Sequence, residues 1–248
     1  MIGVGIVTYN REKQFCRIKN SIKDVNIVFT IKDGGKDKYS VDVDQELQSN
    51  IGVGKCKNIA IQTLLDKGCE HIFLLEDDCL VKDNNVWKYC IDFSKETGLL
   101  HFNWNDYRYP KIGMAECGKF NANLCHNTEA NFSYFHRIFL EKIRFDENYF
   151  NGWEHADLEL QADILQFAPS FGIFMSPSEL SQYLELIDDG ESTITNKNVD
   201  YMYRIQQGRN YFIKKWGKDI LELYDFNINN FKQKFTTIKN RYANSHSN

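Results

Sequence analysis

The stretch His71-Ile72-Phe73-Leu74-Leu75-Glu76-Asp77-Asp78 joins a short apolar run to three consecutive carboxylates. An apolar run of this length, bounded by charge, is typical of a buried strand in a parallel sheet. Ligands of open α/β sheets bind outside the carboxyl ends of the strands, which is where these carboxylates fall. Because adjacent carboxylates repel each other, we predict a hard divalent cation here that also holds a diphosphate. The alternative is a solvated turn or a helix N-terminus, where negative charge is also favourable.

The composition is that of one large globular unit. The chain has 248 residues, of which 42% are hydrophobic and 14% aromatic, so it can bury a sizeable core. Its net charge of −4 gives no general indication of nucleic acid or an anionic membrane. Seven cysteines without a CxxC pair favour reduced thiols in a cytoplasmic protein. We expect no signal peptide and no transmembrane segment, because polar residues follow the first apolar run from Thr8 and no run is long enough.

Apolar strands alternate with amphipathic helices along the chain. The sequence predicts strands at 2–7, 26–31, 72–75, 99–103 and 171–175. It predicts helices at 14–22, 55–67, 86–96 and 156–167. This alternation indicates an α/β fold with a Rossmann-like, mainly parallel sheet flanked by helices. We expect loops at 36–49 and across 104–135, where aromatic, Asn and Gly residues suggest a binding surface.

Two common nucleotide motifs are excluded. A Walker A loop ending at Gly54-Lys55 would need Gly where Ser49 stands and Ser or Thr where Cys56 stands. A dinucleotide fingerprint beginning at Gly3 fails at Thr8.

Polar residues nevertheless follow the first two strands in a pattern suited to a nucleotide diphosphate. Thr8, Tyr9, Asn10 and Arg11 offer an aromatic ring for stacking on a base and donors for ribose or phosphate. Asp33 offers an acceptor for a base N–H or a ribose hydroxyl. Alternatively, Tyr9 is a half-buried loop aromatic and Asp33 caps the glycine turn that follows it.

The stretch from Asn50 to Asn58 leads into a helix and suits anionic oxygens. Gly52 allows close backbone approach, Lys57 supplies positive charge, and the helix N-terminus favours phosphate. The alternative is that Lys57 and Asn58 form a solvated first helical turn, with Asn58 bracing the loop. The carboxylates Glu76 and Asp77 follow the third predicted strand, and we include both among the donor-binding candidates.

Five stretches together resemble the motifs of GT-A fold glycosyltransferases, most closely those of the large glycosyltransferase family 2. They are Val7-Thr8-Tyr9-Asn10-Arg11, Lys32-Asp33-Gly34-Gly35-Lys36-Asp37, Asn50 to Ala60, Leu75-Glu76-Asp77-Asp78, and Phe145-Asp146-Glu147 with Trp153-Glu154-His155-Ala156-Asp157-Leu158. The family patterns are V-T-Y-N-R, D-D-G-S-x-D, N-x-G-x-x-x-A-R-N-x-G, a DxD-type metal motif that takes the form EDD here, and F-D-E followed by E-D-x-D-L. Each stretch is weak evidence alone, but all five occur in order over residues 1–175.

The resemblance implies transfer of a sugar from a nucleotide-diphosphate sugar, by family habit a UDP-sugar, to an acceptor hydroxyl with inversion. It implies a Mn²⁺ or Mg²⁺ ion at Asp78, with Glu76 or Asp77 assisting, to neutralise the leaving diphosphate. Alternatively, Asp77 is structural. A carboxylate would accept the proton of the acceptor hydroxyl, and the candidates are Asp157 and Glu154.

The sequence departs from the family pattern at three positions: Lys57 replaces Arg, Ala60 replaces Gly, and His155 replaces the Asp of the E-D pair. The last departure leaves the base open between Asp157 and Glu154. We expect acceptor contacts at Trp153, His155 and Trp104. Core packing is the alternative for Trp153, and capping, packing or metal ligation for His155. A glycan, a lipid-linked sugar, a protein side chain and a modified nucleic acid all remain open as acceptors.

We expect a nucleotide-sugar-binding and catalytic domain at 1–180 and a helical, basic-aromatic extension packed on it at 181–248. Residues 200–248 carry nine Lys or Arg against four Asp or Glu. The extension is interpreted as a helical layer on the sheet, an acceptor subsite suited to single-stranded nucleic acid, or a membrane-contacting surface.

Two other functions compete with sugar transfer. A sugar-1-phosphate nucleotidyltransferase should carry a Gly-rich loop with Arg or Lys after the first strand, where Thr8-Tyr9-Asn10 stands instead. A non-catalytic glycan- or nucleic-acid-binding protein on a transferase scaffold is expected to lose the acidic motif, which this chain keeps.

Overall fold

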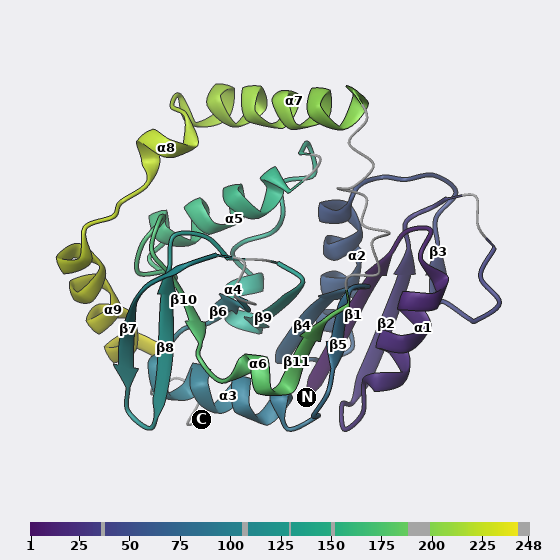
Figure 1. Ribbon diagram of the computed structural model, residues 1–248, viewed down its shortest axis with the longest axis horizontal. Helices are drawn as coiled ribbons and strands as arrows, with labels where there is room; N and C mark the ends of the chain where they lie inside the picture. The colour runs from purple at the N-terminus through teal and green to yellow at the C-terminus, as the bar shows by residue number, and fades with distance from the viewer. Residues whose placement is uncertain (36–37, 106–108, 129, 150–151, 188–198, 243–248) are drawn as a thin grey trace.

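The computed structural model describes residues 1–35, 38–105, 109–128, 130–149, 152–187 and 199–242. Its central strands are β1 (Ile2–Thr8), β2 (Ile27–Lys32), β3 (Gln45–Glu46), β4 (His71–Glu76), β6 (His101–Asn103) and β9 (Phe132–His136). Within the described residues these strands form one sheet in the order β3-β2-β1-β4-β9-β6 (Figure 1). β1 pairs in parallel with β2 and β4, whereas β9 is antiparallel to both of its neighbours. The predicted mainly parallel sheet is therefore confirmed.

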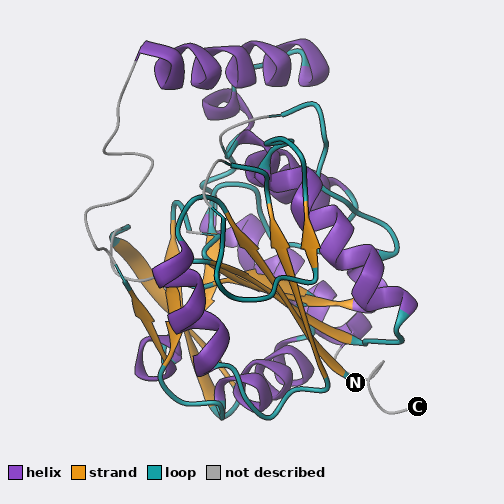
Figure 2. Ribbon diagram, turned by 90° about the vertical axis from the view of Figure 1, so that its right-hand side faces the viewer, coloured by secondary structure: helices purple, strands orange, loops and turns teal. Residues whose placement is uncertain are grey.

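Helices cover both faces of this sheet (Figure 2). They are α1 (Glu12–Ser21), α2 (Val53–Asp66), α3 (Val86–Thr97), α4 (Arg137–Leu140), α5 (Trp153–Ile164), α6 (Leu180–Tyr183), α7 (Val199–Trp216), α8 (Ile220–Leu223) and α9 (Ile228–Tyr242). One buried cluster joins the sheet to α1, α3 and α9, and a second joins it to α2, α4 and α5. The result is a three-layer arrangement with a core on each side of the sheet.

The alternation of side chains along β1 explains how closely α2 approaches the sheet. Val4 and Ile6 point into the cluster on the α1 side. Gly3 and Gly5 point toward α2, where a Cβ on Gly5 would lie 2.9 Å from the Ala60 Cβ. The absence of side chains at these two positions therefore allows the helix that starts at the candidate site to lie against β1.

The predicted loop across 104–135 is wrong. This region contains β7 (Lys111–Cys117) and β8 (Phe120–Cys125), which form an antiparallel sheet with β10 (Phe174–Pro177), as well as β9 of the central sheet. Exposed apolar residues such as Ile112 and Met114 blur the inside-outside alternation of β7, so its strand pattern is not visible in the sequence. The predicted loop at 36–49 contains the two-residue strand β3, and residues 36, 37 and 106–108 lie outside the described residues.

The C-terminal third packs on this body. Beyond residue 180, β11 (Leu184–Leu186) pairs with β5 (Cys79–Val81), which directly follows the acidic triplet. α7 packs on α5, and α9 packs on α3. Phe212, Phe231 and Ile238 anchor these helices and are almost completely buried.

Two further findings concern predictions from composition. All seven cysteines lie within the described residues and are free thiols. Across the described ranges, no helix has both the length and the apolar character needed to cross a membrane.

The tight contact between β1 and α2 leads to a stability prediction. Gly5→Ala should destabilise the protein by about 1–3 kcal/mol, because its Cβ would meet Ala60 and Leu74 in a closely packed layer. Gly113→Ala is the matched control, since a Cβ there makes only an ordinary 3.7 Å contact with Leu124. Urea denaturation of both variants measures the difference, and equal stability of the two would contradict the proposed packing.

Candidate functional site

The candidate site lies where β1, β2 and β4 end side by side. Thr8 ends β1, Lys32 ends β2 and Glu76 ends β4, and the parallel register brings these ends to one edge of the sheet. The loops 9–11, 33–35 and 77–78 start from this edge, as expected for ligand binding in an open α/β sheet.

Asp77 ties the β1–α1 loop to the end of β4. Its Oδ2 accepts a hydrogen bond from Thr8 Oγ1 at 2.7 Å, and its Oδ1 lies 2.7 Å from Arg11 Nη1. The Tyr9 backbone N–H points to the same carboxylate. Burial raises the pKa of Asp77 to about 6, although the Arg11 charge acts in the opposite direction. These contacts match the structural alternative for Asp77, and they occupy part of Arg11 as well.

Lys57 is a fully buried cation that joins three elements. Its ammonium lies 2.7 Å from Glu76 Oε1, 3.0 Å from His155 Nε2 and 3.3 Å from the Ala130 carbonyl oxygen. Burial, followed by the Lys57 charge, lowers the pKa of His155 well below its usual range, so the neutral imidazole accepts a hydrogen bond from the Lys57 ammonium. An ammonium has three protons, and these three acceptors within the described residues use all of them. Lys57 therefore holds Glu76 and His155 in place instead of extending toward a ligand.

Asp78 is oriented differently from the other two carboxylates of the triplet. It is partly exposed, and its Oδ1 accepts a hydrogen bond of 2.7 Å from the Asn131 side-chain amide. No cluster of three or more His, Cys, Asp or Glu side chains in the described ranges has the arrangement of a metal cage. An ion at Asp78 would therefore need oxygen ligands from a substrate, which is how Mg²⁺ is usually bound beside phosphates.

The remaining donor-side residues line the same edge. Asp33 is buried and accepts hydrogen bonds from the backbone N–H groups of Ile51 and Gly52 at 2.7 and 3.1 Å, which holds that loop against β2. These contacts differ from the alternative in which Asp33 caps the glycine turn, and the predicted ligand contact of Asp33 stays a prediction. Tyr9 is 36% exposed, so its ring is accessible for stacking. Asn10 has a φ of 52°, a conformation that Asn tolerates better than most residues.

Asn58 holds the segment 145–147 against α2. Its side chain accepts from the Phe145 N–H and donates to the Phe145 carbonyl oxygen and to Glu147 Oε1. This agrees with the bracing alternative and connects the N-terminal half of α2 to the segment that precedes α5.

Glu154 differs from the other acidic candidates. Its side chain is completely buried, and its Oε2 accepts a hydrogen bond from the Gly152 N–H at 3.0 Å. Its Oε1 has no hydrogen-bond partner among the described residues. Burial raises the pKa of Glu154, with Lys57 lowering it and Glu76 raising it. A buried carboxyl with an unused oxygen next to a ligand-binding edge is suited to proton transfer.

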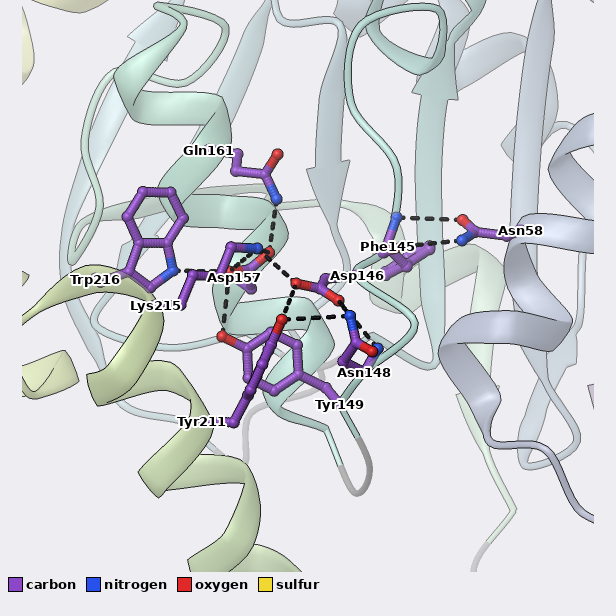
Figure 3. A network of polar contacts seen from close by, with 10 residues as sticks. All are labelled: Asn58, Phe145, Asp146, Asn148, Tyr149, Asp157, Gln161, Tyr211, Lys215 and Trp216. Atoms are coloured by element: carbon purple, nitrogen blue, oxygen red, sulfur yellow. Dashed lines mark hydrogen bonds and ion pairs between the residues drawn. The ribbon is translucent and has the colours of Figure 1, made fainter.

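Asp157, the other base candidate, faces the end of α7 (Figure 3). Its completely buried carboxylate receives hydrogen bonds from Tyr149 Oη, Gln161 Nε2, Lys215 Nζ and Trp216 Nε1 at 2.6–3.3 Å. With both oxygens occupied by these donors, Asp157 has no oxygen directed to an acceptor hydroxyl.

The predicted acceptor residues do not share one surface. His155 lies near the end of β4, because its Nε2 contacts the Lys57 ammonium that also binds Glu76. Trp153 is half-buried and packs against Phe212 of α7, which corresponds to the packing alternative. Trp104 is 3% exposed, and its Nε1 donates to Ser181 Oγ, so its ring faces the core and not an acceptor.

Three contributors to this site have no signal in the sequence. Asn131 lies in a segment predicted as loop, and nothing in its surroundings indicates a role at Asp78. Tyr39, whose hydroxyl bonds to Thr8 and to the Arg11 N–H, also lies in a predicted loop. Lys215 stands in the basic C-terminal segment, but its pairing with Asp157 spans 58 positions and has no local signal.

The buried ion pair gives a prediction for a double-mutant cycle. Glu76→Gln should destabilise the protein by about 1–3 kcal/mol, because it leaves the buried Lys57 ammonium without a counter-charge. The double variant Lys57→Met/Glu76→Gln should lose less stability than the sum of the single variants, since it removes both charges. Urea denaturation measures the coupling, and Lys67→Met, at the exposed residue that follows the C-terminal end of α2, is the control. Strictly additive losses would mean that the pair is not coupled.

Comparison with known proteins identifies the fold of this chain. No protein-family profile and no curated protein matches the sequence. Similar solved structures include TarS 1–349 of S. aureus in complex with UDP-GlcNAc, with a TM-score of 0.56, 15% identity, and coverage of 97% of this chain and 72% of that chain. The mannosyltransferase PcManGT from Pyrobaculum calidifontis, in complex with GDP-Man and Mn²⁺, has a TM-score of 0.55, 11% identity, and coverage of 99% and 70%. The chain therefore has the GT-A glycosyltransferase fold, as the resemblance at 7–11 and 75–78 predicted.

Proposed function

We propose that this protein is a glycosyltransferase that takes its sugar from a nucleotide-diphosphate donor, with a UDP-sugar as the first candidate. The observation that carries the proposal is the sheet edge where Asp78 lies beside the loops that start at Thr8 and Asp33. The fold neighbours add support, because one is in complex with UDP-GlcNAc and another with GDP-Man.

Donor binding is proposed for the loops of this edge. Tyr9 offers an exposed ring for the base, and the Asp33–Gly52 contact holds the 50–52 loop at the start of α2, whose N-terminus would favour the phosphates. Arg11 is held at the same edge by Asp77. Lys57 acts indirectly, by holding Glu76 and His155.

Asp78 is proposed to hold the metal, with Asn131 orienting its carboxylate. A Mn²⁺ or Mg²⁺ ion bound there would neutralise the charge of the leaving diphosphate. The donor set fits such an ion, because one carboxylate plus substrate phosphates is a common arrangement for hard divalent cations. Glu76 is the weaker ligand candidate, since Lys57 already balances its charge.

Glu154 is proposed as the residue that accepts the proton of the acceptor hydroxyl. Its buried Oε1 has no hydrogen-bond partner among the described residues, whereas Asp157 is fully bonded and the His155 Nε2 lone pair accepts from Lys57. The raised pKa makes its carboxylate a stronger base than an ordinary glutamate. With one base and one in-line displacement, the sugar would be transferred with inversion.

The test is nucleotide release from a panel of nucleotide sugars, with Mn²⁺ and with EDTA. Metal-dependent release from one donor should be lost in Asp78→Asn and kept in Asp66→Asn, which changes an exposed carboxylate at the far end of α2. If no donor is turned over and neither UDP nor GDP with Mn²⁺ raises the melting temperature, the proposed function is wrong.

Glu154→Gln should lower the transfer activity while raising the melting temperature relative to wild type as the pH rises. Transfer should fall by about 10²–10⁴-fold, because the amide cannot accept the proton. Burial raises the folded-state pKa of Glu154, so ionisation of this group opposes folding as the pH rises through that pKa. The melting temperature of Glu154→Gln relative to wild type should therefore increase between pH 4.5 and pH 8.

Paired thermal melts and transfer rates measure both effects, with the exposed Glu185→Gln as the control. A variant that loses stability as the pH rises, or keeps full activity, would rule out this role for Glu154.

A further inference from the structure

We propose that Lys215, near the C-terminal end of α7, is a positioning residue that holds the turn carrying Glu154 in its active geometry. This inference rests on the proposed function, and it assigns to the C-terminal segment a part in the active site. Lys215 does not contact the donor edge itself, so it acts through the residues that it holds.

The first support is the position of the Lys215 ammonium between two carboxylates (Figure 3). Its Nζ lies 2.7 Å from Asp146 Oδ2 and 2.9 Å from the Asp157 carboxylate. The Asp157 side chain has no exposure, and that of Asp146 is 13% exposed. Without a cation between them, two carboxylates in such a place repel each other and lose solvation.

The pKa values of Lys215 and Asp146 both reflect this contact. Burial acts to lower the pKa of Lys215, but its hydrogen bonds to Asp146 and Asp157 outweigh burial and raise it. Burial acts to raise the pKa of Asp146, and the bond from Lys215 is the largest of the contacts that bring it below its usual value. Of the four described donors to Asp157, Lys215 is the charged one, since Tyr149, Gln161 and Trp216 are neutral.

The second support is what the two carboxylates are attached to. Asp146 follows Phe145, whose backbone N–H and C=O are both bonded to Asn58, next to Lys57. Asp157 lies three residues after Glu154 in α5, so the two occupy the same helical turn. Lys215 thus links the segment before α5 to the first turn of α5, and Glu154 lies between these two points in the sequence.

The third support is the close packing of α7 on the start of α5. A Cβ on Gly208 would lie 2.4 Å from Trp153 Cδ1, so α7 can approach this ring only because residue 208 is glycine. Phe212, one turn later, is completely buried and also packs on Trp153. Neighbouring Tyr211 donates from its hydroxyl to Asp146 Oδ2. Apolar and polar contacts together therefore hold α7 against the turn of α5 that carries Glu154.

The experiment compares Lys215→Met with Lys215→Arg and with Lys214→Met, whose lysine is the exposed neighbour on the same helix. The first readout is amide hydrogen exchange of peptides that cover 145–149 and 153–157, which needs no substrate. Lys215→Met should speed exchange in both segments, whereas Lys215→Arg and Lys214→Met should leave it near the wild-type rate.

The second readout is steady-state transfer. Lys215→Met should lower kcat by about tenfold or more, because small misplacement of a catalytic group is costly, while KM for the donor changes little. Lys215→Arg should recover most of kcat. Wild-type exchange and wild-type kcat in Lys215→Met would overturn the proposal, as would a loss of kcat that Lys214→Met reproduces.

A second variant guards against misfolding of Lys215→Met. Gly208→Val introduces no change of charge, but its side chain would displace α7 from Trp153. It should give the same faster exchange at 153–157, and unchanged exchange there would count against the proposal. If the wild-type protein turns over no donor, the proposed function fails, while the exchange data still decide whether Lys215 holds the two segments.

Discussion

A buried ammonium at Lys57 connects α2 to β4, to α5 and to the backbone at Ala130. It bridges Glu76 at the end of β4, His155 in the first turn of α5 and the carbonyl oxygen of Ala130, while its own backbone belongs to α2. Removing a charge from water is costly, so the site depends on all three acceptors staying in place. Gly3 and Gly5 contribute from the other side, because they let α2 lie close enough to β1 for Lys57 to reach β4.

As a result, the three carboxylates of the acidic triplet make different contacts and have different roles. Glu76 balances Lys57, Asp77 holds the β1–α1 loop through Thr8 and Arg11, and Asp78 projects beside Asn131. The repulsion that three adjacent carboxylates would suffer is relieved mainly by protein cations at the first two. The third carboxylate, that of Asp78, is partly exposed and accepts a hydrogen bond from the neutral amide of Asn131.

The sequence predicted the elements whose signals are local. Strands β1, β2 and β4 have dense apolar runs, and α2 has helical periodicity. The donor-side candidates stand in the chain at or directly after the ends of these strands, so they could be found from the strand positions. The β7–β8 hairpin was missed because Ile112 and Met114 face outward and mask the alternation of β7. The roles of Asp157 and Trp104 could not be predicted either, since their partners Lys215 and Ser181 are 58 and 77 positions away. Residue types alone indicate that a carboxylate lies in a motif, but not which way it faces.

The long separation between Lys215 and its partners also has a consequence for the order of events during synthesis. The central sheet is complete once β9 has emerged at residue 136, and its contacts can form while the rest of the chain is still being made. The turn that carries Glu154 acquires its cationic partner only after residues 215 and 216 have left the ribosome. The strands of the central sheet would therefore be complete in a nascent chain well before the buried carboxylate of Asp157 acquires its partners from α7.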